Sequence, residues 1–349
     1  MSENGKEALI EVRDIKVYFY LDEGTVRAVE GVSFDIARGK VLGVVGESGC
    51  GKSVTSQAVM RIVPSPGKIT QGDIFYYRYR DDGSVEKVEI TKLDPRGKEI
   101  RSIRGNEIAK IFQEPMTSLS PVHTIGNQIM EAIILHQKVD KAEAREKAID
   151  VLDQVGLPQP SQRIDYYAHQ LSGGMRQRAM IAMALSCNPS LLIADEPTTA
   201  LDVTTEAQIL ELMKGLQDQF HMAIMFITHN LGVIAEMADD VVVMYLGKDV
   251  ELATVDETFY DPHHPYLRDL LRSIPHIGRK KSGERLRTIT GSVPDPYNVP
   301  IGCPYHPRCS EFIPGKCNVD QEIPFYEIRP GHWTRCWLYE GKKVRQPHV

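Results

Sequence analysis

The sequence predicts an α/β protein with a mostly parallel β-sheet, and three observations support that fold class. Short apolar runs at residues 41–45, 191–194 and 223–228 alternate along the chain with longer helical patterns. This alternation is typical of parallel strands joined by helices. A glycine-rich turn connects the first run to a helical stretch that ends before Pro64. Near residue 256 prolines become dense and periodicity fades, which indicates an extension beyond the core.

Strand patterns near the N-terminus predict antiparallel pairing. Residues 9–19 alternate apolar and polar side chains, as an edge strand does. Two strand-like runs within residues 72–93 flank Asp82-Gly83, which is a strong hairpin signal. Residues 124–157 carry helical periodicity instead. We therefore expect a β-rich region and a helical region in addition to the parallel sheet.

Composition narrows the class of function. The chain has 349 residues, of which 42% are apolar and 25% charged, as in ordinary globular proteins. Its 41 basic and 47 acidic residues give a net charge of −6, whereas nucleic-acid-binding proteins are usually basic. No apolar run approaches the roughly 18–20 residues that span a bilayer, and the N-terminus lacks an apolar signal core. We expect a cytoplasmic protein whose membrane role, if any, is indirect.

The cysteines are unevenly placed. Four of the six lie in the last 47 residues: Cys303, Cys309, Cys317 and Cys336. In a reducing compartment such clustering indicates metal or cluster chemistry before disulfides. Four thiolates suit tetrahedral zinc or an iron–sulfur cluster, although zinc sites usually show closely spaced cysteine pairs, which are missing here.

A phosphate-binding loop is the clearest chemical motif. Residues 46–53 read Gly-Glu-Ser-Gly-Cys-Gly-Lys-Ser and match G-x-x-x-x-G-K-[ST] between a predicted strand and a predicted helix. The glycines let backbone N–H groups wrap a phosphate at the start of the helix. Lys52 would reach the β- and γ-phosphates, and the Ser53 hydroxyl would ligate Mg²⁺. The candidate nucleotide-binding residues are Gly46, Glu47, Ser48, Gly49, Cys50, Gly51, Lys52, Ser53 and Val54.

Two acids end the apolar run at residues 191–194. Asp195 would join the Mg²⁺ shell, and Glu196 would polarise the water that attacks the γ-phosphate. Paired acids at a strand end can also merely cap the next helix. The complete phosphate-binding loop favours the catalytic interpretation.

Further motifs resemble those of ABC ATPases, in the order that this family shows. They are Leu171-Ser-Gly-Gly-Met-Arg-Gln177 for the signature, Gln113 for the Q-loop, Thr199-Ala-Leu-Asp202 for the D-loop and His229 for the switch histidine. The resemblance spans roughly residues 9–255 and is highly specific. Met175 departs from the glutamine that many members carry, and we interpret it as a subfamily variant.

The resemblance implies a nucleotide sandwich between two subunits. Ser172 is a good helix N-cap, and Gly173 and Gly174 let a phosphate approach the helix they begin. In the family this signature contacts the γ-phosphate of ATP held by a second subunit, in a head-to-tail dimer. Asp202 would communicate across that dimer interface.

The same resemblance assigns roles around the chain's own nucleotide. His229 would contact the γ-phosphate, while Gln113 would sense Mg²⁺ and the attacking water. Phe19 occupies the place where an aromatic residue usually stacks on adenine. Tyr18 and Tyr20 are rivals, because a shift of one residue exchanges the faces of a strand.

The family also implies an architecture. We expect a P-loop NTPase (RecA-like) core with an antiparallel β subdomain, an α-helical signature subdomain and a C-terminal extension. The expected divisions are 1–113 for the first part of the core with the β subdomain, 114–171 for the helical subdomain, 172–255 for the rest of the core, and 256–349 for the extension. Residues 114–121 are expected near a membrane subunit.

The extension resembles the tail of oligopeptide and dipeptide transporter ATPases of the peptide/nickel family. The residues that carry this likeness are His264-Pro265-Tyr266, Gly291-Ser-Val-Pro294, Gly302-Cys303, Arg308-Cys309, Cys317 and Gly331-His332 before Cys336. The likeness implies an importer ATPase at the cytoplasmic face of the membrane. Its expected partners are a second ATPase subunit (a paralogue or an identical copy), two permease subunits and, indirectly, an external solute-binding protein.

The expected cofactors are ATP, Mg²⁺ and a [4Fe–4S] cluster on Cys303, Cys309, Cys317 and Cys336, with zinc as the alternative. The resemblance favours the cluster. The alternative function is a soluble ABC ATPase in nucleic-acid repair or translation. Acidic charge, a single phosphate-binding loop and the importer-like tail argue against it.

Overall fold

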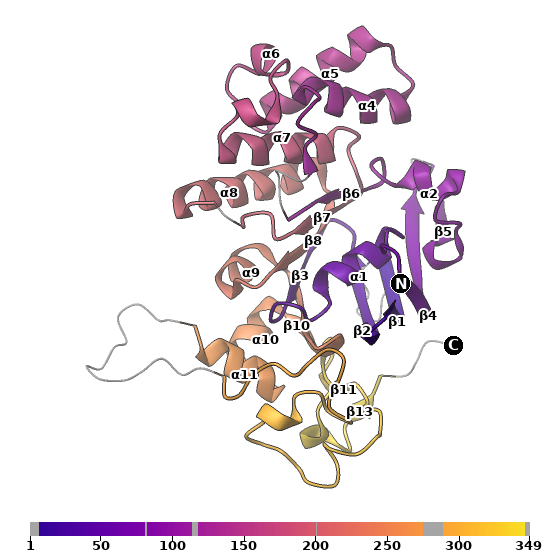
Figure 1. The fold of residues 1–349 in the computed structure, drawn as a ribbon, viewed down its shortest axis with the longest axis vertical. Coiled ribbons are helices and arrows are strands. Elements are labelled where there is room, and N and C mark those ends of the chain that lie inside the picture. Colours follow the sequence, from indigo (N-terminus) through magenta and orange to yellow (C-terminus); the bar gives the residue numbers. More distant parts are fainter. Residues whose placement is uncertain (1–6, 81, 114–117, 200, 275–288, 346–349) are drawn as a thin grey trace, which may run out of the picture.

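The computed structural model describes residues 7–80, 82–113, 118–199, 201–274 and 289–345. Within these residues the chain forms a nine-stranded mixed sheet and a four-stranded antiparallel sheet, with helices on the larger sheet (Figure 1). The predicted α/β class is confirmed. No helix of the described part is both long and apolar enough to cross a bilayer.

The centre of the large sheet is parallel, in the order β9-β3-β8-β7-β6. The strands are β3 (Val41–Val45), β6 (Ile108–Ile111), β7 (Leu191–Asp195), β8 (Ala223–Thr228) and β9 (Asp240–Tyr245). Strands β3, β7 and β8 are buried along their whole length, which explains their continuous apolar sequences. The helices of this core are α1 (Lys52–Val59), α8 (Val203–Phe220) and α9 (Leu231–Met237).

The antiparallel sheet lies beside the core, in the order β2-β1-β4-β5. Its strands are β1 (Ala8–Leu21), β2 (Gly24–Ala37), β4 (Gly67–Tyr79) and β5 (Val85–Glu89), followed by η1 (Ile90–Lys92) and α2 (Lys98–Ile103). Strands β4 and β5 pair across the predicted hairpin. Apolar side chains of β1 and β2, including Val17 and Phe34, are fully buried in one cluster with Val44 of β3. This shared core fixes the small sheet against the phosphate-binding loop.

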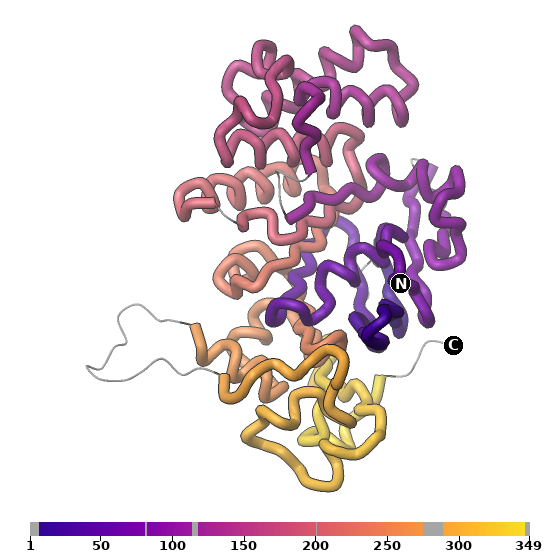
Figure 2. Tube along the Cα trace, in the orientation of Figure 1, coloured from indigo at the N-terminus to yellow at the C-terminus, as the bar shows by residue number. Residues whose placement is uncertain are grey.

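A helical layer forms the end of the molecule opposite the C-terminal extension (Figure 2). It contains α4 (Ile125–Gln137), α5 (Lys141–Gln154), α6 (Pro160–Arg163), η2 (Ala168–Gln170) and α7 (Gly173–Leu185). Side-chain caps explain the starts of α4, α5 and α7, because Thr124, Asp140 and Ser172 each accept a backbone N–H. Of the segment predicted to approach a membrane subunit, residues 114–117 lie outside the described residues.

The C-terminal extension joins the core sheet rather than forming an irregular tail. Strand β10 pairs with β9 on one side and with β12 on the other, and β11 and β13 complete that edge. The elements are β10 (Lys248–Thr254), α10 (Val255–Tyr260), α11 (Pro265–Arg272), η3 (His306–Arg308), β11 (Tyr326–Arg329), β12 (His332–Thr334), η4 (Trp337–Tyr339) and β13 (Lys343–Val344). Strands of two to four residues are too short to produce a visible alternation, which explains why the periodicity fades after residue 256 although strands are present there.

Candidate functional site

The phosphate-binding loop follows β3 at the centre of the sheet and leads into α1. Backbone crowding requires glycine at two of its positions. A Cβ atom at Gly46 would lie 2.2 Å from the Met244 carbonyl oxygen, and one at Gly51 would lie 2.2 Å from that of Ala28. Both glycines also have positive φ. No side chain caps the start of α1, so its first N–H groups remain available to a phosphate.

The lysine and serine of the loop lie as the motif predicts. Lys52 is buried, and its Nζ donates to the carbonyl oxygens of Gly46 at 2.8 Å and Glu47 at 3.1 Å. The Ser53 hydroxyl donates to Asp195 Oδ1 at 2.9 Å. Ser53 of α1 and Asp195 of β7, which were both predicted as Mg²⁺ ligands, therefore lie together. Their side-chain oxygen atoms suit that ion.

Lys110 is a residue of this site that the sequence analysis missed. Its Nζ donates to Asp195 Oδ2 at 2.8 Å and to the Ser56 hydroxyl at 2.7 Å, and both members of the ion pair are buried. The ammonium group neutralises Asp195 when no divalent cation is present. A lysine within the apolar strand Ile108–Ile111 was the only sequence signal for it.

Glu196 lies at the centre of a second group, just beyond β7. Its Oε2 accepts from Gln113 Nε2 at 2.9 Å and from the Thr199 hydroxyl at 3.1 Å. His229 Nδ1 lies 3.3 Å from Glu196 Oε1, and the histidine side chain is 65% exposed. Glu196 has a φ of 48°, which is uncommon for a non-glycine residue and typical of functional positions. The three predicted catalytic residues therefore meet.

A cavity of about 320 Å³ opens over the loop. Its lining residues are Val26, Arg27, Ala28, Ser48, Gly49, Cys50, Gly51, Lys52, Ser53, Val54, Gln113, Glu196, Leu246, Gly247, Pro296 and Val299. Pro296 and Val299 come from the extension, which therefore forms part of the cavity wall. The spacing of the sequence motifs did not predict this contribution. Cys50 is 3% exposed, and burial raises the pKa of its thiol.

The predicted adenine platform does not line this cavity. Phe19 pairs with Val26 across β1 and β2 and packs so closely on Gly67 that a Cβ there would lie 2.6 Å from its ring. Val26 is the member of that pair that lines the cavity. The Tyr18 hydroxyl donates to Glu30, and Tyr20 is 48% exposed. Adenine stacking on Phe19 stays a prediction.

The signature and D-loop residues lie away from the phosphate-binding loop. Ser172 caps α7 by accepting the Met175 N–H, and the space beyond Gly173 is open. Neither these residues nor Gly174 lines the cavity over the loop. Asp202 caps α8 through Thr205, whose hydroxyl and N–H hold the pKa of that carboxyl below its usual value. An open helix N-terminus and a nucleotide cavity thus occupy separate places on the chain.

Glu47 does not face the nucleotide cavity. Its carboxylate accepts from Arg308 Nη1 at 2.7 Å and Nη2 at 3.2 Å, and its backbone N–H donates to the Tyr266 hydroxyl at 2.9 Å. Arg308 is 8% exposed and also donates to the Tyr245 hydroxyl at 3.2 Å. The extension therefore contacts the phosphate-binding loop directly, through the residue next to Cys309.

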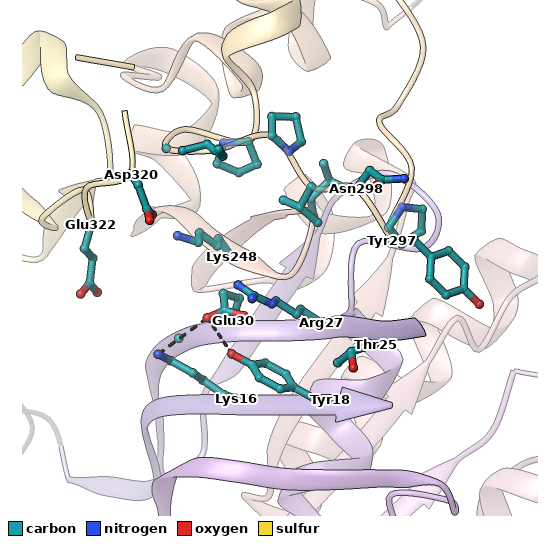
Figure 3. Close-up of a pocket in the computed structure, with 18 of the residues that line it drawn as sticks. Lys16, Tyr18, Thr25, Arg27, Glu30, Lys248, Tyr297, Asn298, Asp320 and Glu322 are labelled. Atoms are coloured by element: carbon teal, nitrogen blue, oxygen red, sulfur yellow. Dashed lines mark hydrogen bonds and ion pairs between the residues drawn. The ribbon is translucent and has the colours of Figure 1, made fainter. Parts of the chain in front are cut away.

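A larger cavity of about 770 Å³ lies between the antiparallel sheet and the extension (Figure 3). Arg27 and Lys248 face Asp320 and Glu322 across it. It shares Arg27, Leu246, Pro296 and Val299 with the smaller cavity. The two cavities therefore adjoin, and the extension borders both.

The four clustered cysteines converge from separate parts of the extension. Cys303, Cys309, Cys317 and Cys336 all line one small cavity, together with His264 and His306. All four are free thiols. Burial raises the pKa of Cys303 to about 11 and that of Cys336 to about 12. The predicted ligands are therefore brought together, although up to 33 residues separate them in sequence.

Two sequence families match this chain, one in the ATP-binding core and the helical region and the other mainly in the C-terminal extension. A family described as "ABC transporter" matches residues 29–199. A second family, described as "Oligopeptide/dipeptide transporter, C-terminal region", matches residues 250–317. The first match contains the phosphate-binding loop, the signature and the Asp195-Glu196 pair. The second contains Arg308 and three of the four clustered cysteines.

Individual proteins are similar over nearly the whole chain. A probable peptide ABC transporter ATP-binding protein of Sinorhizobium fredii is 48% identical, covering 97% of both chains. The oligopeptide transport ATP-binding protein AppD of Bacillus subtilis is 48% identical, covering 97% of this chain and 99% of its own. The dimeric ATP-binding cassette MJ0796 bound to ADP and phosphate superimposes with a TM-score of 0.60 at 25% identity, covering 70% of this chain and 98% of that one. The chain belongs to the ABC transporter ATPases, among the ATP-binding subunits of peptide transporters.

Proposed function

We propose that this chain is the ATPase subunit of a membrane importer for di- or oligopeptides or a related solute. The observation that carries the proposal is the meeting of Glu196, Gln113 and His229 beside a complete phosphate-binding loop. Glu196 accepts the proton of the attacking water or polarises it, and Lys52 stabilises the charge on the transferred phosphoryl group. Ser53 and Asp195 would hold Mg²⁺, and the ion would supply positive charge to offset that of the phosphate oxygens.

The working unit is a head-to-tail dimer of cassettes. The N-terminus of α7, at Ser172, Gly173 and Gly174, does not line the nucleotide cavity of its own chain. It therefore cannot contact the phosphates of a nucleotide bound in that cavity. A partner cassette presenting its ATP to this helix end would satisfy the free N–H groups. ATP then joins the two cassettes, and hydrolysis lets them separate. The partner is a paralogue or an identical copy.

Transport follows from the coupling of this dimer to membrane subunits. Two permease subunits supply the membrane-spanning helices, and an external binding protein delivers the solute. ATP-driven closure favours one access state of the permeases because ATP binds the closed dimer more tightly than the open one. The chain works at the cytoplasmic face of the membrane, peripherally attached. ATP-dependent peptide uptake by the reconstituted complex tests this function.

The alternative, a soluble ABC ATPase acting on nucleic acid, has no support from the comparisons. The similar proteins have peptide-transport names, and they match this chain over almost their full length. The extension matches the family described as "Oligopeptide/dipeptide transporter, C-terminal region".

The cysteine cavity fits an iron–sulfur cluster better than zinc. Four thiolates are the usual ligands of a [4Fe–4S] cluster. Tetrahedral zinc with Zn–S bonds of about 2.3 Å holds its sulfurs ~3.8 Å apart. Among the described residues, no three cysteine sulfurs lie within 4.8 Å of one another. Cys303, Cys309, Cys317 and Cys336 would hold the cluster through their four thiolates.

The cavity also indicates when the cluster would be inserted. Its volume is about 10 Å³, which is the size of one water molecule. A cluster would need the surrounding loops to move apart from these positions, so we expect its binding to be coupled to the folding of the extension. Its chemistry at this site is structural: it would join loops that share few regular hydrogen bonds.

Anaerobically purified protein should contain about four iron and four acid-labile sulfide atoms per chain, as a [4Fe–4S] cluster requires. A Cys317→Ser variant should lose both and unfold at lower temperature, whereas Cys187→Ser, outside the cavity, should keep both. Stoichiometric zinc without sulfide would contradict the cluster and support the zinc alternative.

A further inference from the structure

A group of metal-ligating side chains lies outside both the nucleotide site and the cysteine cavity. Asp261 and His263 lie between α10 and α11, and His332 begins β12. One ligand atom from each lies within 4.8 Å of the others, and no other such group occurs in the described part of the chain. None of the three lines the nucleotide cavity or the cysteine cavity. The established motifs of the chain assign no role to them.

His332 presents an unsatisfied nitrogen to this group. The ring is fully buried, and its Nε2 lies 2.8 Å from Oε1 of the equally buried Glu251. Glu251 also accepts the backbone N–H groups of His263 and His264, so it acts as an acceptor here, and His332 Nε2 donates to it. In the neutral ring Nδ1 is then a bare acceptor, and it has no hydrogen-bond partner. Burial without a hydrogen-bond partner is unfavourable for such a polar atom, because it loses the hydrogen bonds that water would supply.

In the described part of the chain, no carboxylate lies within hydrogen-bonding distance of His332 Nδ1. The nearest carboxylate oxygen to Nδ1 is Oε1 of Glu257, at 3.9 Å. That distance is too long for a hydrogen bond. A metal ion between the two atoms would contact both, because metal–ligand bonds of about 2.0–2.2 Å on each side span such a gap.

In His263, as in His332, one ring nitrogen is engaged by a neighbouring side chain. Its Nδ1 lies 3.0 Å from the Tyr339 hydroxyl, which itself donates to the His263 carbonyl oxygen. Nδ1 therefore donates to Tyr339, and Nε2 is left as an acceptor only 3.3 Å from Asp261 Oδ2. With this tautomer, His263 Nε2 and Asp261 Oδ2 face each other as two acceptors, an arrangement that a cation between them would stabilise.

We propose that Asp261, His263 and His332 bind a divalent transition-metal ion such as Zn²⁺, with Glu257 close enough to complete the coordination. Imidazole nitrogens with carboxylate oxygens suit zinc, cobalt or nickel, whereas calcium and magnesium take oxygen ligands alone. Glu251 and Tyr339 act as outer partners that orient the two rings, as such partners do in known metal sites. The ion joins the end of α10 to β12 of the extension.

Arg329 competes with this ion. Its guanidinium donates to Asp261 and lies 3.6 Å from Glu257, and its side chain is 49% exposed. It neutralises the carboxylates from the solvent side and can swing away. A metal ion would take its place at Asp261, so the removal of Arg329 should strengthen metal binding.

Titration of the full-length protein with Co²⁺, followed by absorbance and by displacement with Zn²⁺, tests the site. We expect one equivalent of Co²⁺ with ligand-field bands and without the intense sulfur-to-metal bands that cysteine ligation gives. His263→Gln and Asp261→Asn should each weaken binding by more than about 10-fold, since even outer partners contribute that much. Arg329→Ala should strengthen it, and His136→Gln, in α4, should leave it unchanged.

Thermal unfolding and ATP binding of each variant establish that it folds. The ion should raise the unfolding temperature of the wild type, because it binds only the folded site, but not that of His263→Gln. Equal affinities in wild type and His263→Gln would overturn the proposal. So would a cobalt spectrum showing only thiolate ligation, or weaker binding by Arg329→Ala.

Discussion

Glu196→Gln should bind ATP as the wild type does but hydrolyse it about 10²–10⁴-fold more slowly, which is the usual contribution of a positioned general base. The amide keeps the size of the side chain, and its oxygen can still accept from Gln113 or Thr199. It cannot accept a proton from water. The change therefore removes the chemistry and preserves the geometry, so that ATP accumulates unhydrolysed.

Steady-state phosphate release and equilibrium binding of a fluorescent ATP analogue measure the two properties separately. Glu211→Gln, an exposed position on α8, is the matched control and should retain full turnover. Because the proposed dimer is joined by unhydrolysed ATP, the Glu196→Gln variant should also elute as a dimer when Mg²⁺ and ATP are present. Turnover near that of the wild type would refute the role of Glu196.

Arg308→Ala should weaken ATP binding although Arg308 lies outside the nucleotide cavity. The change leaves the Glu47 carboxylate without its two charge-assisted hydrogen bonds. Removing one partner of a buried pair costs about 3–5 kcal/mol, and the 24% exposure of Glu47 places the effect near the lower value. Without Arg308, the Glu47 side chain no longer fixes the phosphate-binding loop. The carbonyl oxygens of Gly46 and Glu47 in that loop accept hydrogen bonds from Lys52, so the position of Lys52 is less well fixed too.

A double-mutant cycle with Glu47→Gln, Arg308→Gln and the double variant isolates this contact. We expect each single change to raise the dissociation constant for ATP about 10-fold, with a double variant less impaired than the sum. Arg345→Ala, on a distant part of the extension, is the control and should bind ATP normally. Unchanged affinity in Arg308→Gln would show that the contact only stabilises the fold.

Sequence reasoning recovered the parts of the site that are contiguous. The phosphate-binding loop is a single run of eight residues, and its strand, helix and backbone geometry follow from local glycine requirements. Asp195 and Glu196 were identified for the same reason, since a buried strand ended at them. Ser172 was predicted as a helix N-cap from its residue type and position, and the structure shows it capping α7.

Contacts between distant residues were not recoverable from spacing. Arg308 and Glu47 are 261 residues apart, and nothing near either one indicates its partner. The strands β11–β13 are stabilised by pairing with β10 rather than by a local pattern. The family resemblance favoured Phe19 for adenine stacking and left Tyr18 and Tyr20 as rivals, whereas the position of the Phe19 ring depends on its packing against Gly67. Tertiary structure decides such cases because several local choices are equally compatible with the sequence.

The most direct test of the account is uptake of labelled di- and oligopeptides by proteoliposomes. They would contain this chain, its partner cassette and both permeases, with ATP on the cassette side and the binding protein on the other. We predict uptake that requires ATP and falls to background with Glu196→Gln in both cassettes. Uptake that persists with Glu196→Gln, or ATP hydrolysis that never moves peptide and ignores the permeases, would contradict the proposed function.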